Sequence, residues 1–118
     1  MLWVLDPNAR QGLAAQVASQ VRRGLVDGEL TAGDLLPSSA ELAQVLGVNA
    51  NTVLAAYRSL RDEGLLEFRR GRGVRVRHDA EHDAKVLQAA REFAEVAAEF
   101  GYTADHFPEL MRRAGATI

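Results

Sequence analysis

Two adjoining stretches decide the fold of this 118-residue chain: LPSSAELA at residues 36–43 and LGVNANTV at residues 46–53. Ser38 or Ser39 can cap a helix here, and Ser38 together with Glu41 matches a capping box, in which side chains bond to free backbone N–H groups at a helix start. Gly47 suits a tight turn, and Asn49 can cap a second helix. Two short helices joined in this way are typical of a helix-turn-helix, whose second helix offers its first residues to base edges in the DNA major groove.

Apolar periodicity predicts the other helices of this region. Leucine and valine recur every four residues from about residue 10 to 27, which indicates a helix that Gly28 ends. Residues 29–36 are expected to form a loop. The two central helices are expected over about 39–46 and 50–63.

A hairpin is predicted after the helices. Apolar and charged residues alternate strictly in 74–77, which indicates a half-buried strand, and residues 65–69 supply its partner. Arg70-Gly71-Arg72-Gly73 between them suits a hairpin loop. The sequence therefore predicts a mainly α, winged helix-turn-helix domain over residues 1–77, with a two-stranded wing.

Residues 78–118 are expected to form a separate two-helix tail. Asp79 can cap a helix that runs to about Phe100, with apolar residues at three-four spacing along one face. This face either packs on the chain's own winged domain or, as we favour, meets a second copy in a symmetric dimer. The candidate dimer-interface residues are Val86, Ala90, Phe93, Ala97 and Phe100.

The last helix is expected over about residues 106–114. We favour Asp105 as its cap, because Pro108 then falls in the first turn, where no backbone hydrogen bond is lost. With Thr103 as the cap instead, Pro108 would weaken the start of the helix.

Charge is distributed unevenly along the chain. The net charge is −2, yet residues 1–77 carry +2 and residues 78–118 carry −4, and five arginines lie within 69–77. Such a basic cluster favours contact with phosphates. The chain has no cysteine, which permits any compartment and suits the cytoplasm. We see neither a signal peptide nor a run of about 20 apolar residues that could span a bilayer, so no membrane partner is expected.

Patterns typical of catalysis do not occur in the sequence. We find no phosphate-binding glycine loop after a strand and no nucleophile or metalloprotease motif, so we expect neither enzymatic activity nor a cofactor. His78 and His82 stand four residues apart, as metal ligands on a helix can. The spacing fixes no third ligand, so no metal site is expected.

Residues 10–77 resemble the DNA-binding domain of the GntR family of bacterial transcription regulators. The resemblance rests on many residues in one register, among them Gly33-Asp34-x-Leu36-Pro37-Ser38-Ser39-x-Glu41-Leu42-Ala43, Gly47-Val48-Asn49-x-Asn51-Thr52-Val53 and Glu63-Gly64-Leu65. The short helical tail resembles the YtrA subfamily. That resemblance implies dimerisation and, often, repression of operons that encode ABC-type transporters.

The helix-turn-helix pattern and the resemblance together indicate the DNA contacts. Asn51 and Thr52 are expected to contact bases or phosphates, and Arg70 or Arg72 to enter the minor groove. Tyr57 is expected to pack in the core, with its hydroxyl within reach of a phosphate. The candidate DNA-binding residues are Ser38, Ser39, Asn49, Asn51, Thr52, Tyr57, Arg58, Arg70, Gly71, Arg72 and Gly73.

Ala40 and Ala50 depart from the family pattern, which usually has arginine at the first of these positions and often at the second. The contacts implied for those arginines cannot be carried over, so we expect weaker affinity or an altered sequence preference. The sequence thus predicts a regulator that binds double-stranded DNA, as a homodimeric repressor on a palindromic operator. The alternative is a winged-helix protein-interaction module with weakened DNA binding, and a small-molecule effector is left open.

Overall fold

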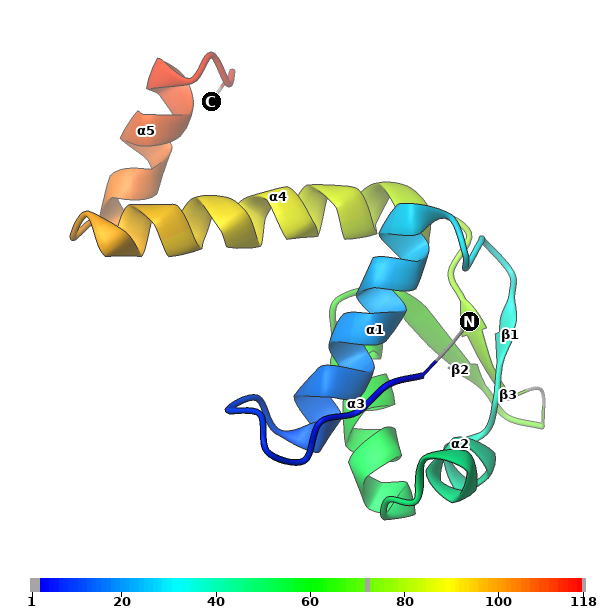
Figure 1. Ribbon diagram of the computed structural model, residues 1–118. Helices are drawn as coiled ribbons and strands as arrows, with labels where there is room; N and C mark the ends of the chain where they lie inside the picture. The colour runs from blue at the N-terminus through cyan, green and yellow to red at the C-terminus, as the bar shows by residue number, and fades with distance from the viewer. Residues whose placement is uncertain (1–2, 72, 118) are drawn as a thin grey trace. The chain divides into compact units, whose positions relative to one another are not determined.

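The computed structural model describes residues 3–71 and 73–117 (Figure 1). In chain order its elements are α1 (Leu13–Asp27), β1 (Leu35–Leu36), α2 (Ser39–Leu46), α3 (Ala50–Asp62), β2 (Leu66–Arg69), β3 (Gly73–Val76), α4 (Ala80–Glu99), the 3-10 turn η1 (Ala104–His106) and α5 (Phe107–Arg113). The chain divides into two compact units, residues 1–85 and 86–118, so the first unit extends into α4. Ala80 and Ala84, at the start of α4, are both buried.

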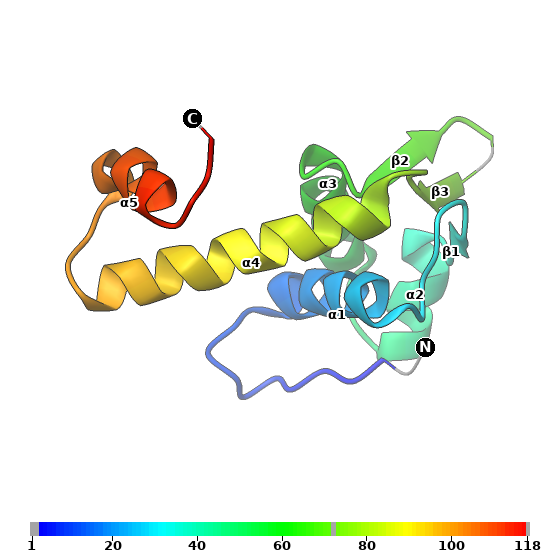
Figure 2. The same cartoon turned by 90° about the horizontal axis from the view of Figure 1, so that it is seen from above.

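The first unit packs three helices beside a small sheet, with the recognition helix α3 against α1, α2 and β2 (Figures 1 and 2). Its core comes from apolar residues at helical spacing on α1 and α3, together with the inward side chains of the strands. The largest fully buried residues are Val17, Val21, Leu25, Leu42, Val53, Tyr57, Leu60, Leu65, Leu66 and Val76. The predicted mainly α winged fold is confirmed.

The sheet has three antiparallel strands in the order β1-β3-β2, rather than the two strands of the wing alone. The expectation of a simple loop over residues 29–36 is therefore wrong at its end. Leu35 pairs with Arg75 and Leu36 with Val74, which makes this short segment an edge strand of the wing sheet. On the other side of β3, Phe68 pairs with Val74.

An extended N-terminal segment lies along α1 and is held by two glutamine side chains. The amide of Gln20 bonds to both the N–H and the carbonyl of Val4, at 2.7 and 2.5 Å. One turn earlier, the amide of Gln16 does the same with Asp6, at 2.8 Å for each bond. All four bonds go to main-chain atoms. The spacing matches, because four residues along a helix rise about 6 Å and two residues of an extended segment rise about 6.6 Å.

The second unit contains the rest of α4, η1 and α5. The Phe93 ring meets the Phe107 ring edge to face, with 4.9 Å between centroids. Thr103, not Asp105, caps the turn, and its backbone N–H donates to Nδ1 of His106 at 2.9 Å. The preference for Asp105 is wrong because η1 comes first and α5 begins only at Phe107. Pro108 still falls in the first turn of α5.

None of the helices within residues 3–71 and 73–117 is both long enough and apolar enough to cross a membrane.

Candidate nucleic-acid interface

Side-chain caps fix the starts of α2 and α3. The Ser38 hydroxyl accepts a hydrogen bond from the Glu41 N–H at 3.0 Å, which is the serine half of the predicted capping box. The Asn49 side chain accepts from the Asn51 N–H at 2.8 Å. Between the two helices Gly47 has φ +69°, a left-handed conformation that other residues rarely adopt. The geometry of the turn therefore depends on Ser38, Gly47 and Asn49, whose roles can be recognised from the local sequence.

The recognition helix α3 has one buried and one exposed face. Val53, Ala56, Tyr57 and Leu60 are buried, whereas Asn51, Ala55 and Arg58 are exposed and lie along one side. Thr52 is half-buried, and Ser39 of α2 likewise. The exposed side of α3 thus presents an amide, a small residue and a guanidinium in succession.

Tyr57 must be removed from the candidate contacts. Its side chain is 0% exposed. Its hydroxyl donates to the carbonyl of Pro37 at 2.8 Å, so the polar group is already used inside the domain. Burial, followed by the charge of Glu41, raises the pKa of Tyr57. Tyr57 therefore holds the helix-turn-helix together, and the expectation that its hydroxyl reaches a phosphate is wrong.

The wing presents cations at its tip. Arg70 and Gly71 are exposed, and Gly71 and Gly73 have φ values of +74° and +79°, which glycine tolerates. Arg72 lies outside the described residues. Below the tip the Arg69 guanidinium pairs with Glu67 at 3.1 Å. Of the arginines described here, Arg70 is the one best placed at the tip to meet DNA.

Two arginines outside the candidate list have structural partners. The Arg22 guanidinium of α1 binds both carboxylate oxygens of Glu63, at 2.9 and 3.0 Å, just after α3. Burial lowers the pKa of Arg22. Arg61 lies over the Phe68 ring at 5.0 Å and pairs with Asp62. Nothing local in the sequence marks the Arg22–Glu63 pair, because 41 residues separate its members.

The candidate dimer residues fall into two groups. Val86 and Phe100 are 69% and 75% exposed, and Ala90 is exposed too. Phe93 instead packs on Phe107, and Ala97 is buried within the second unit. The apolar surface that the second unit leaves open is therefore narrower than the predicted stripe.

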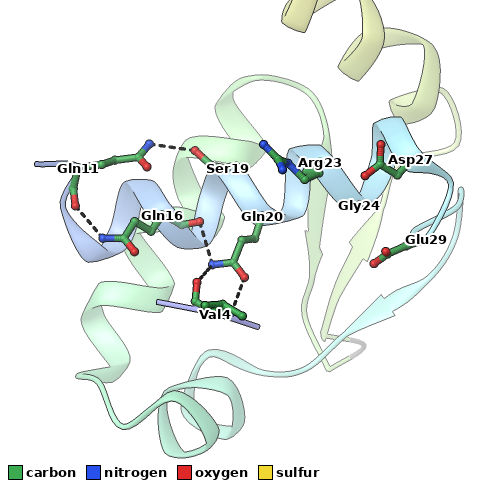
Figure 3. A pocket seen from close by; sticks show the side chains of 9 residues that line it. All are labelled: Val4, Gln11, Gln16, Ser19, Gln20, Arg23, Gly24, Asp27 and Glu29. Atoms are coloured by element: carbon green, nitrogen blue, oxygen red, sulfur yellow. Dashed lines mark hydrogen bonds between the residues drawn. The ribbon is translucent and has the colours of Figure 1, made fainter. Parts of the chain in front are cut away.

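A pocket of about 400 Å³ lies beside α1 (Figure 3). Its walls include Gln16 and Gln20, whose amides are bonded to the N-terminal segment, and Gln11, whose amide donates to the Ser19 hydroxyl at 3.0 Å. These polar side chains of the pocket wall are therefore already engaged in hydrogen bonds within the domain. Across residues 3–71 and 73–117, no group of three or more His, Asp or Glu side chains could hold a metal ion.

Comparison with known proteins gives a consistent result. Residues 13–76, more than half of the chain, match the model of the bacterial regulatory proteins of the gntR family. The HTH-type transcriptional repressor YtrA of Bacillus subtilis is 37% identical over 76 residues, which cover 64% of this chain and 58% of that protein. The chain therefore matches little more than half of the length of this relative.

Solved structures agree with the sequence match. YtrA from Sulfolobus acidocaldarius, a GntR-family transcription factor, superposes with a TM-score of 0.64 at 33% identity, over 80% of this chain and 99% of that one. The DNA-binding domain of AraR in complex with operator ORR3 superposes with a TM-score of 0.52 at 26% identity, over 64% of this chain and 94% of that one. One similar domain has thus been solved on its operator DNA.

Proposed function

Because the chain belongs to the GntR family of bacterial regulatory proteins, whose members bind DNA, we propose that it is a transcriptional repressor that binds a palindromic operator as a homodimer. The observation that carries the proposal is the pair of capped helix starts beside an arginine-tipped wing in one compact unit. Such a domain can place α3 in a major groove and the wing in the adjacent minor groove.

Base reading is assigned to the first turn of α3. The exposed Asn51 amide suits adenine, and the Thr52 methyl group suits the methyl group of thymine. Ala40 and Ala50 are both exposed and offer neither charge nor hydrogen bonds. Since a bidentate arginine contact to guanine is worth about 1–3 kcal/mol, we propose a site that depends less on G·C pairs than those of typical relatives.

We assign dimerisation to exposed apolar side chains on α4 and at Phe100, the residue that follows it. Val86, Val96 and Phe100 are all more than half exposed in the chain itself. Exposed apolar side chains of this kind favour association, and a two-fold pair of identical surfaces would cover them. Two-fold symmetry then requires two half-sites about one helical turn apart. We propose repression rather than activation because the Bacillus subtilis relative is named a repressor.

The test is a fluorescence-anisotropy titration of the full chain against its own upstream intergenic DNA and a scrambled duplex, at several salt concentrations. We expect tighter binding to the native fragment, with a salt slope of several units. Asn51→Ala should reduce the preference for the native fragment. Its matched control is Ser59→Ala, which changes an exposed residue on the last turn of the same helix.

Equal and weak binding to both duplexes, followed by failure to enrich any site from random DNA, would favour the protein-interaction module instead. Repression itself is tested with a reporter driven by the enriched site. Reporter output should fall when the protein is expressed and recover with the Asn51→Ala variant. A rise in reporter output would instead indicate an activator.

A further inference from the structure

A continuous segment, residues 33–38, runs from the base of the wing to the start of α2, and we call it the brace. At its wing end, the Gly33 N–H donates to the Val76 carbonyl and the Val76 N–H donates to the Asp34 carbonyl, each at 2.9 Å. The strand β1 that follows is paired with β3. The first half of the brace is therefore hydrogen-bonded to a strand of the wing.

The other end of the brace is bonded to the recognition helix. Pro37 has no N–H, so its carbonyl is its single main-chain hydrogen-bonding group. That carbonyl accepts the Tyr57 hydroxyl at 2.8 Å, from the fully buried face of α3. The next residue is Ser38, the cap of α2. The Tyr57 hydroxyl therefore orients the peptide that leads into α2 and joins it to α3.

Side chains of the brace also contact the wing and the core. Leu36 is buried, while Leu35 is 59% exposed and lies against Gly73, the first residue of β3. A Cβ atom placed on Gly73 would come within 3.2 Å of Cδ1 of Leu35, so strand and wing are in close contact there. One short segment thus connects the wing, α2 and α3, the three parts of the domain that the proposed function places against DNA.

We propose that Tyr57 is a positioning residue that sets the placement of the wing relative to the recognition helix, and so determines how far binding depends on the base pairs beneath the wing. The inference rests on the proposed function, because it requires that α3 and the wing meet the same duplex. A wing held in place beforehand loses little freedom on binding, whereas a loosened wing must be ordered at that step. The DNA contacts of a loosened wing therefore contribute less to affinity.

The experiment is a double-mutant cycle on the full chain. Tyr57→Phe removes the hydroxyl and keeps the ring, and Arg70→Ala removes the wing cation. Affinity is measured by anisotropy on a duplex enriched from random DNA with the wild-type chain. We expect Arg70→Ala to weaken binding at least about threefold less in the Tyr57→Phe background than in the wild type, a coupling typical of linked residues.

A matched control separates positioning from loss of stability. Gln16→Met also removes part-buried hydrogen bonds, but these go to Asp6 and Gln11, which lie outside the brace. Thermal melts establish that both variants are folded at the titration temperature. We expect Gln16→Met and Arg70→Ala to act additively, since they share no partner.

A second brace variant keeps the test decisive if Tyr57→Phe does not fold. Leu35→Ala removes the contact with Gly73 at the start of β3 from a largely exposed position, and it should couple to Arg70→Ala in the same direction. Additive effects for both brace variants would overturn the inference while leaving the proposed function intact. A wild-type chain that enriches no duplex would instead contradict the proposed function before the cycle is begun.

Discussion

Replacing Gln16 by glutamate tests the hydrogen bonds that hold the N-terminal segment. The Gln16 side chain is only 8% exposed. Its Nε2 group donates to the carbonyls of Asp6 and Gln11, each at 2.8 Å, and its Oε1 atom accepts from the Asp6 N–H at 2.8 Å. A carboxylate has the same shape but no donor, so Gln16→Glu places negative charge against two carbonyl oxygens.

The expected loss of stability at neutral pH is about 3 kcal/mol. Each of the two lost donor bonds contributes about 1 kcal/mol net, and the two part-buried carbonyls left without a donor together cost about 1 kcal/mol more. The folded state also raises the pKa of the introduced carboxyl group above its unfolded value of about 4.3. The loss of stability in Gln16→Glu is therefore complete above the folded-state pKa of the carboxyl group. It shrinks as the pH falls below that pKa, because a protonated carboxyl group can donate one hydrogen bond.

Urea denaturation followed by circular dichroism, near neutral pH and near about pH 4.5, measures this difference. Trp3, the single tryptophan of the chain, adjoins the bonded segment and gives a fluorescence signal for its release. Gln16→Met is the control: it loses the bonds without adding charge, so its deficit should not vary with pH. If the deficit of the glutamate variant failed to shrink at the lower pH, the assigned bonding of this amide would be refuted.

Three further predictions concern stability and assembly. Arg22→Lys should cost about 1 kcal/mol in urea denaturation, because lysine cannot reproduce the forked contact with Glu63; a cost near zero would show that the fork adds nothing. Since burial raises the pKa of Tyr57, its contribution to stability is complete below its unfolded value of about 10 and is lost as the pH rises further. Alkaline unfolding should accordingly be less steep in Tyr57→Phe than in the wild type, and identical pH profiles would contradict this. Phe100→Glu should shift sedimentation from dimer toward monomer at micromolar concentration, with Tyr102→Ser as a nearby control, whereas an unshifted dimer would exclude the surface around Phe100 as the interface.

Local rules were sufficient where the hydrogen-bonding partners lie within one turn. Ser38 and Asn49 cap their helices through N–H groups two or three residues later, so their roles can be read from spacing alone. The apolar face of α3 likewise follows from helical periodicity. These features locate the helix-turn-helix without knowledge of the rest of the chain.

Features that depend on distant partners could not be predicted in the same way. The two residues of β1 are too few to show a period, and they form a strand only because β3 lies beside them. The Tyr57 hydroxyl finds its acceptor at Pro37, twenty residues earlier, which no spacing rule indicates. The choice of Asp105 over Thr103 was wrong because an extra 3-10 turn separates the cap from α5.

The glutamine pair on α1 has a consequence for how the N-terminal segment can vary. Gln16 and Gln20 bond to the main-chain N–H and carbonyl groups of Val4 and Asp6, so these contacts do not depend on the side chains of the two docked residues. Almost any residue at positions 4 and 6 would satisfy them, except proline, which lacks the N–H. Homologues that keep this docked segment should therefore keep both glutamines, whereas the amino acids at positions 4 and 6 should vary.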